Sequence, residues 1–201
     1  MAITTYAQLQ TAVSNWLKRG DLSTYIPDMI TLAEARIMRE VRARSMETSF
    51  SDTIASGVIA LPTSYIELKF AYINSSTVQW LKRQKPLFIY EKYPTRSASG
   101  LPKYISREGS NFIFGPYPDT TYTVNGVYYK DIGPLSSSDH VLFTENPDLY
   151  LFATLAEAEP FIKNDKRVQL WETKYRQIRD QINGLQDTEE YSGSDLQMVA
   201  G

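Results

Sequence analysis

The spacing of apolar residues changes period twice along this chain, and that change limits the folds that it can adopt. Near both ends, apolar residues recur at intervals of three and four, the spacing of an amphipathic helix. Between residues 46 and 145 they alternate with other residues, as in Ile66, Leu68 and Phe70, which is the spacing of a strand. Because each element must bury its apolar face against another element, we predict an α+β fold. In it the N- and C-terminal helices form a helical bundle, with an inserted antiparallel β domain.

Two helices are expected before residue 45. Thr5 and Gln8 have the spacing of a capping box, in which each side chain bonds a backbone N–H near the other residue. Pro27 suits the first turn of a second helix, because the N–H that proline lacks has no helical partner there. The first helix carries an apolar stripe of Leu9, Ala12, Val13, Trp16 and Leu17.

Two further helices are expected near the C-terminus. Asn146-Pro147-Asp148 combines a cap residue, a first-turn proline and an acid near the positive end of the helix dipole. Pro160 is expected to end this helix, and Asn164 or Asp165 to cap the last one. The stripe of the last helix is Val168, Trp171, Tyr175, Ile178 and Ile182.

The middle of the chain is expected to form short antiparallel strands in a small sandwich or an open barrel, because Pro, Gly and Ser clusters separate the alternating runs. Residues 108–111 have the composition of a hairpin connection. Asn125-Gly126 lies inside a further strand, where the glycine favours a bulge or a close backbone approach.

These patterns divide the chain into three parts. We expect residues 1–45 and 146–185 to form the helical bundle and residues 46–145 to form the β domain. Residues 186–201 are expected to be a flexible C-terminal arm in the free monomer, because acidic and small residues there bury too little to offset chain ordering.

The sequence carries few of the groups that catalysis requires. Cysteine is absent, which excludes disulfides and thiolate sites, and no glycine-rich phosphate motif occurs. The single histidine, His140, follows a Ser/Asp-rich stretch and is expected to be solvated. Glu157 and Glu159 have the wrong helical spacing to share one face and hold a metal. We therefore predict no enzyme activity, no catalytic residues, no cofactor and no metal.

Charge and hydropathy argue against two classes of partner. A formal net charge of −2 does not favour broad affinity for nucleic acid, which needs a dominant basic face. No apolar run approaches the ~18 residues that span a bilayer. The N-terminus also lacks the basic start and apolar stretch of a signal peptide. We expect a soluble protein that is made in the cytoplasm and binds no membrane.

A cluster of arginines marks the second helix. Arg36 and Arg39, and likewise Arg39 and Arg42, are three residues apart and can share a helix face. Such a face can be solvated, contact carboxylates of a protein partner or bind nucleic acid. Because Glu34 and Glu40 dilute the positive field, we favour a protein contact over nucleic acid.

The C-terminal arm combines an acidic stem with an apolar tip. Glu189 and Glu190 belong to the stem, and Leu196, Met198 and Val199 form the tip. This composition fits a frayed terminus or an arm that docks on a partner. We predict docking of these five residues.

Several short motifs, in this order along the chain, resemble those of the head-to-tail connector (adaptor) proteins of short-tailed bacteriophages. They are Thr5–Leu9, Trp16-Leu17, Asp21-Leu22, Ile26–Asp28, Ala33–Ile37, Leu61-Pro62, Tyr65–Leu68, Pro102–Tyr104, Tyr128-Tyr129, Asn146–Leu151, Ala156–Ala158, and Asp165 and Arg167 before Trp171. The resemblance runs from residue 4 to residue 182 and leaves the tail from Gln186 uncovered.

The resemblance implies a structural virion protein that sits in the neck beneath the portal protein and receives the tail nozzle or tail tube. It implies a homo-oligomeric ring, a dodecamer matched to the portal, with DNA passing transiently through the lumen. It also implies no enzyme activity. On this view the arginine face and the arm contact the portal or an adjacent subunit.

Two other functional classes stay open. A nucleic-acid-binding module would use the arginine-rich second helix. A carbohydrate-binding tail component would use the tyrosine-rich strands, because seven of the 14 tyrosines lie between residues 90 and 129. Ordinary strand packing also explains such tyrosines, and we favour it over a binding role.

Overall fold

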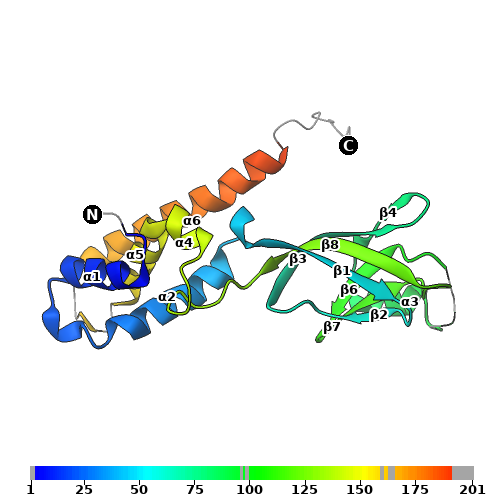
Figure 1. The fold of residues 1–201 in the computed structure, drawn as a ribbon, viewed down its shortest axis with the longest axis horizontal. Coiled ribbons are helices and arrows are strands. Elements are labelled where there is room, and N and C mark those ends of the chain that lie inside the picture. Colours follow the sequence, from blue (N-terminus) through cyan, green and yellow to red (C-terminus); the bar gives the residue numbers. More distant parts are fainter. Residues whose placement is uncertain (1–2, 96, 98–99, 159–160, 163–165, 192–201) are drawn as a thin grey trace. The chain divides into compact units, whose positions relative to one another are not determined.

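The computed structural model describes residues 3–95, 97, 100–158, 161–162 and 166–191. The chain divides into two compact units, which are described separately (Figure 1). The helical unit comprises residues 1–46 and 132–201, and the β unit comprises residues 47–131. Residues 132–145, which the sequence pattern assigned to the β domain, cluster with the helices. That the two units fold as separate domains stays a prediction.

The helical unit contains five of the α-helices of the described chain, with a short 3₁₀ turn after each of the first two. The elements are α1 (Tyr6–Leu17), η1 (Gly20–Leu22), α2 (Ile26–Glu40), η2 (Arg44–Met46), α4 (Val141–Glu145), α5 (Pro147–Glu157) and α6 (Arg167–Tyr191). Helix α5 packs against α1, α2 and α6, so it is the central helix of the unit. Accordingly, most of its side chains between Leu149 and Ala156 are buried.

Local sequence signals explain where these helices begin and end. The predicted capping box is confirmed: the Gln8 N–H donates to Thr5 Oγ1, and the Thr5 N–H donates to Gln8 Oε1, both at 3.3 Å. Helix α1 ends at Lys18, whose φ of 53° is left-handed. Helix α2 ends at Glu40, because Val41 adopts an extended conformation. Helix α6 continues to Tyr191, beyond the predicted end near Ile182, and so includes the start of the predicted arm.

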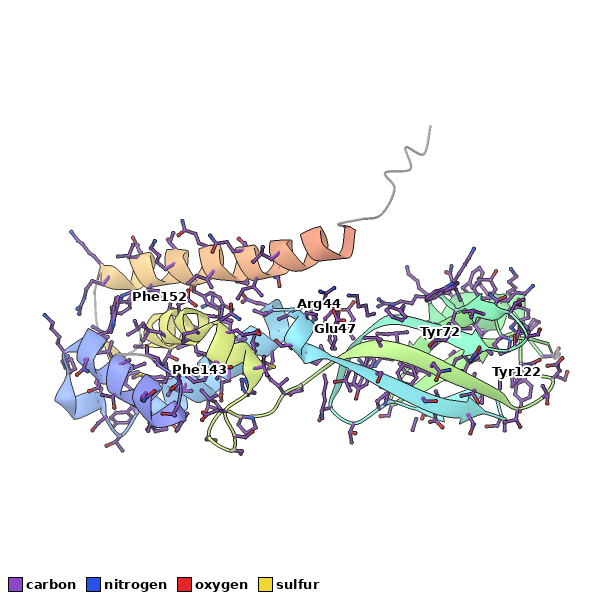
Figure 2. The ribbon with its side chains drawn as sticks, turned by 45° about the horizontal axis from the view of Figure 1, so that its top comes forward. Arg44, Glu47, Tyr72, Tyr122, Phe143 and Phe152 are labelled. Atoms are coloured by element: carbon purple, nitrogen blue, oxygen red, sulfur yellow. The ribbon has the colours of Figure 1, made fainter. Side chains whose placement is uncertain are left out.

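The two tryptophans that the sequence placed in the helical core differ in burial. Trp171 is 2% exposed and belongs to the core, together with the fully buried Tyr150 and Tyr175. Trp16 is 47% exposed, so its prediction as a core residue was wrong. The Trp16 ring packs edge-to-face with the Phe152 ring, and the two ring centroids are 5.6 Å apart. Trp16 therefore covers the core from outside. Phe152 is labelled in Figure 2.

The β unit contains eight strands in two four-stranded sheets, and one short helix. The elements are β1 (Glu47–Ile54), β2 (Val58–Ala60), β3 (Tyr65–Asn74), β4 (Val78–Trp80), β5 (Lys82–Arg83), α3 (Pro86–Lys92), β6 (Tyr104–Glu108), β7 (Asn111–Gly115) and β8 (Tyr122–Lys130). The strand orders are β1-β8-β3-β4, here called sheet A, and β2-β7-β6-β5, called sheet B. The pairs are antiparallel except β5 with β6, which is parallel and departs from the predicted all-antiparallel pattern.

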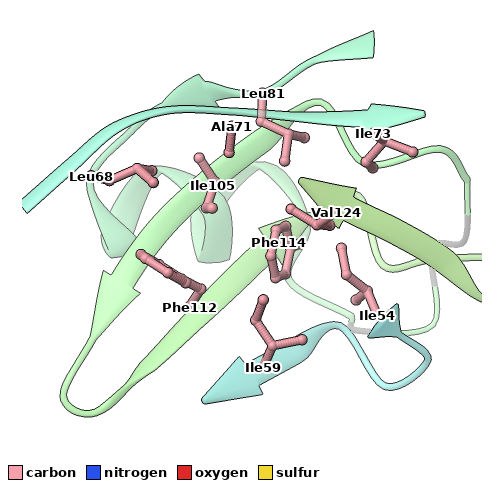
Figure 3. Packing of buried hydrophobic residues seen from close by; sticks show 10 residues of the cluster. All are labelled: Ile54, Ile59, Leu68, Ala71, Ile73, Leu81, Ile105, Phe112, Phe114 and Val124. Atoms are coloured by element: carbon pink, nitrogen blue, oxygen red, sulfur yellow. The ribbon is translucent and has the colours of Figure 1, made fainter. Parts of the chain in front are cut away.

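A single hydrophobic core fills the space between the two sheets (Figure 3). Sheet A contributes Ile54, Leu68 and Val124, and sheet B contributes Ile105, Phe112 and others. The arrangement is therefore a small sandwich, one of the two predicted forms. The predicted hairpin is also present: β6 and β7 pair from Tyr104 with Gly115 to Glu108 with Asn111.

Gly126 lies in an unbroken strand. A glycine is needed there because neighbouring strands approach its backbone closely. A Cβ at this position would lie 2.5 Å from the Phe50 ring and 2.6 Å from the Phe70 carbonyl oxygen. The irregularity is on the neighbouring strand instead, where the register of β3 against β8 shifts between Leu68 and Phe70. Leu68, Ala71 and Ile73 therefore face the core. Phe70, which the alternation placed with Leu68, is 36% exposed.

Candidate functional site

Arg36 holds three helices of the helical unit together. Its Nη1 and Nη2 atoms donate to the two carboxylate oxygens of Glu172 at 2.8 and 2.7 Å, the bidentate geometry of a strong ion pair. Its Nε atom donates to Glu40 at 3.2 Å, and Nη1 lies 3.5 Å from Glu157. The guanidinium also stacks 4.3 Å from the centroid of the Tyr175 ring. Residues of α2, α5 and α6 are thus joined through one side chain.

A second arginine completes this network. Arg179 donates from Nη1 to Glu40 Oε2 at 2.8 Å, and the Tyr175 hydroxyl donates to the same oxygen at 3.2 Å. The hydrogen bonds from Arg36 lower the pKa of Glu172. Burial alone would raise the pKa of Glu40, but hydrogen bonds from Arg179 and Arg36 bring it below its ordinary value. Both carboxylates are therefore held in their charged form.

The three arginines predicted as one partner-binding face occupy three different environments. Arg36 is only 17% exposed at its side chain and is used within the unit. Arg39 is exposed and makes no ion pair with the residues that the structure describes. Arg42 lies past the end of α2, where Nη1 donates to the carbonyls of Met38 and Val41. Arg42 therefore does not continue the helical face of Arg36 and Arg39, because α2 ends at Glu40. Contact of the three arginines with a partner stays a prediction.

The structure describes only part of the predicted docking arm. Glu189 and Glu190 lie in the last turns of α6, but their side chains fall outside the described part of the chain. Leu196, Met198 and Val199 also lie outside the described residues. Docking of these five residues stays a prediction.

The sequence pattern missed a buried polar cluster in the helical unit. Glu34, 9% exposed, accepts a 2.6 Å hydrogen bond from the Leu135 N–H. Tyr150 is fully buried, and burial followed by the nearby charge of Glu34 raises its pKa. Its hydroxyl and both ring nitrogens of His140 are buried and have no hydrogen-bond partner among the described residues. The centroids of the two rings lie 5.7 Å apart.

His140 is thus packed against the core rather than solvated, so that prediction was wrong. Burial lowers the pKa of His140 more than the charge of Asp139 raises it. The imidazole contacts Tyr150 and, among the described residues, has no serine or carboxylate hydrogen-bonded to it. The described part of the cluster therefore lacks the geometry of a nucleophile with its base.

The outer face of sheet A carries exposed aromatic side chains. Trp80 is 57% exposed and packs against Phe70 and Tyr72, with ring centroids 5.7 and 5.5 Å away. Figure 2 labels Tyr72 on this sheet. Beside these rings lies a shallow groove of about 310 Å³, whose polar lining includes Ser49 and Asn125. The shift in register after Leu68 turns Phe70 and Tyr72 outward, and the alternation alone gave no sign of it.

Two further classes of site were searched for in the described part of the chain. No group of three or more His, Asp or Glu side chains there is placed to hold a metal ion. Among the described helices, none combines the length and the apolar character needed to cross a membrane.

Comparison with models of protein families places the chain in a known family. The model of the SU10 adaptor protein family matches residues 4–198. The match extends past the predicted end of the resemblance at residue 182 and includes most of the C-terminal tail. No curated protein shows a significant match to the chain. Because the family model covers nearly all of the chain, this α+β protein belongs to the SU10 adaptor protein family, a family of phage head-to-tail adaptors.

Proposed function

We propose that the protein forms a ring at the head-to-tail junction of the virion, links the portal protein to the tail nozzle or tail tube, and lines the DNA exit path. The observation that carries this proposal is the family match over residues 4–198. The family establishes a structural adaptor role in a phage particle. The ring, its partners and its place along the DNA path are our extension of that role.

The charge of the chain fits a path through which DNA slides. Tight binding of duplex DNA requires many basic side chains that displace counterions from phosphates. A chain with a net charge of −2 lacks that excess, and Arg36 is committed to Glu172 and Glu40. We therefore propose that DNA passes through the lumen transiently, and we disfavour the nucleic-acid-binding module. We also propose that the protein has no enzyme activity, in keeping with its structural adaptor family.

Stoichiometry follows from the proposed partner. A ring of identical subunits needs a heterologous interface that closes on itself. We propose a dodecamer that matches the portal, assembled from chains made in the host cytoplasm. Exposed Arg39, together with Glu189, Glu190, Leu196, Met198 and Val199, supplies the contacts that we assign to neighbouring virion proteins.

The experiment that tests the proposal uses particles of the phage that encodes the chain. Heads that lack this protein should be filled and retain the portal but carry no tail. Adding the purified protein, followed by tail components, should restore tails, and an equal amount of heat-unfolded protein should not. Heads that acquire normal tails without the protein would contradict the proposal.

One second candidate has a specific observation in its favour. Trp80, Phe70 and Tyr72 beside Asn125 and Ser49 give sheet A the exposed rings and polar groups that saccharides bind. A carbohydrate-binding tail component would show saturable changes in Trp80 fluorescence with host surface polysaccharide. Loss of that response in Trp80→Ala would support this function, and absence of a response in the parent protein would dismiss it.

A further inference from the structure

The basic residues of the β unit are concentrated in one stretch of sequence. Residues 47–131 contain nine Lys and Arg against seven Asp and Glu, whereas the rest of the chain contains 12 against 16. Within the β unit, residues 82–107 hold seven of the nine basic residues and a single acid, Glu91. The β unit therefore has a net positive charge, although the whole chain is slightly acidic.

A groove in the β unit lies within this basic stretch. Its volume is about 270 Å³, below the ~300–1,000 Å³ of pockets for drug-sized ligands, so it suits one or two side chains. Residues of both sheets line it: Tyr65, Leu68, Arg83, Gln84, Lys85, Pro86, Ile105, Ser106, Arg107 and Phe112. Leu68, Ile105 and Phe112 are almost fully buried and form an apolar floor. Arg83, Lys85 and Arg107 are exposed and form a cationic rim.

Of the three cations on this rim, only Arg83 has a carboxylate within ion-pair distance in the described structure. Arg107 donates from Nε to the Gly109 carbonyl at 3.2 Å, and its guanidinium lies 5.4 Å from the centroid of the Tyr65 ring. Arg83 donates to the Leu68 carbonyl at 2.8 Å and has one exposed carboxylate, Glu67, at 3.4 Å. In the described structure, neither Lys85 nor Arg107 has a carboxylate within ion-pair distance.

The C-terminal segment of the chain has the complementary chemistry. Residues 187–201 contain four acids, Asp187, Glu189, Glu190 and Asp195, and no Lys or Arg. Leu196, Met198 and Val199 directly follow the last acid. Helix α6 carries the chain to Tyr191, which leaves ten residues beyond it. An apolar group next to a carboxylate is what an apolar groove with a cationic rim binds.

We propose that this groove binds the C-terminal segment of a second copy of the chain. Leu196 or Met198 enters the apolar groove, and Asp195 meets the cationic rim. The contact joins neighbouring subunits, and it rests on the proposed ring. One such contact is weak, because the segment loses conformational freedom on docking. A closed ring repeats it at every subunit and raises its effective concentration.

The absence of cysteine allows a direct test in full-length chains. One chain carries Gln84→Cys in the lining of the groove, and a second carries Gln197→Cys beside the apolar tip. The two are mixed, assembled on portal-bearing heads and mildly oxidised, and disulfide-linked dimers are measured. In the matched control, Gln84→Cys is replaced by Thr53→Cys, at an exposed position of β1 outside the groove. We expect dimers from the Gln84→Cys pair and about tenfold fewer from the control pair, equivalent to ~1.4 kcal/mol.

Charge reversal tests the assigned role of the rim. Arg83→Glu with Arg107→Glu should lower the dimer yield about tenfold, and adding Asp195→Lys to the other chain should restore it. Lys130→Glu with Lys166→Glu changes the net charge equally at exposed residues outside the groove and should leave the yield unchanged. Melting curves of each variant establish that it is folded. The restored pairing stays informative if the reversed rim lowers stability.

Two results would overturn this inference. One is a disulfide yield from Gln84→Cys no higher than from Thr53→Cys in assembled necks. The other is a disulfide that joins the Gln197→Cys chain to the portal or another virion protein in place of the Gln84→Cys chain. In either case the chain would still be present in necks, so the proposed function would stand. Absence of the chain from necks would refute the proposed function instead.

Discussion

At the scale of single residues, Arg36 and Arg39 lie three positions apart on one helix, and we assign a structural role to Arg36 and a surface role to Arg39. Arg36→Glu places a fourth carboxylate beside Glu172, Glu40 and Glu157 and removes the bidentate pair. We expect it to lower the free energy of unfolding of the helical unit by about 1.5–3 kcal/mol, the range for hydrogen bonds to charged groups. Urea unfolding followed by circular dichroism measures this.

Arg39→Glu is the matched control, because Arg39 is exposed on the same helix. It should change stability by no more than ~0.5 kcal/mol. Its expected effect is on attachment to heads, through the partner contact proposed for Arg39. Equal destabilisation by both substitutions would contradict the assignment of Arg36 as the structural residue.

The same network predicts a dependence of stability on pH. The pKa of Glu172 is lowered in the folded state, chiefly by hydrogen bonds from Arg36, and the pKa of Glu40 is lowered too. A lowered carboxyl pKa stabilises the folded chain above the unfolded value, near 4.5. That stabilisation is lost as pH falls through the folded-state pKa.

Melting temperatures measured from pH 7 to pH 3 should therefore fall below pH ~4.5. Glu172→Gln should be less stable at pH 7 and should show a smaller fall. A fall as large in Glu172→Gln as in the parent protein would show that other groups carry the pH dependence.

Trp171 and Trp16 form a second pair of residues with contrasting burial. Trp171→Ala should cost about 3–5 kcal/mol, because it empties a site that is 2% exposed. Trp16→Ala removes a ring that is 47% exposed and should cost much less. Thermal unfolding of both variants tests the prediction, and similar losses would contradict this description of the helical core.

At the scale of elements, the packing of β1, β8 and β3 in sheet A depends on Gly126, which has no side chain. Gly126→Ala would push a methyl group into the Phe50 ring and the Phe70 carbonyl, which is backbone and cannot move aside alone. We expect a loss of about 1–3 kcal/mol, as for an overpacked core. Gly20→Ala meets nothing within 4 Å and should be tolerated. A stable Gly126→Ala protein would mean that β1 and β3, the two neighbours of β8, can shift relative to it.

Local signals in the sequence predicted the elements whose causes are local. The capping box of Thr5 and Gln8, the first-turn Pro27 and the connection around Gly109 each depend on backbone requirements within a few residues, so they could be predicted from the sequence. The outward turn of Phe70 could not, because the change in register arises only when β3 pairs with β8.

The predicted site shows the same limit. The carboxylate that engages Arg36, Glu172, lies 136 residues away in the sequence, and no local pattern joins the two. The groove of the β unit likewise combines residues 65, 68, 83–86, 105–107 and 112. The density of basic residues between 82 and 107 is the one local signal of the groove, and the nearly neutral charge of the whole chain masks it.

At the scale of the whole molecule, the C-terminal segment should matter to assembly more than to folding. A chain that ends after Tyr191 retains α6 and loses Leu196, Met198 and Val199. We expect its melting temperature to match that of the full chain within about 1–2 °C, a shift of a few tenths of a kcal/mol. Its attachment to portal-bearing heads should be reduced. Equal attachment of both proteins would show that the segment is a frayed end.

The central claim, a ring of this chain between portal and tail, is tested most directly by electron cryo-microscopy of intact virions. The chain should account for a ring of 12 copies directly beneath the portal, with the DNA path along its axis. A chain found at the periphery of the tail, or in no ring at the neck, would contradict the account.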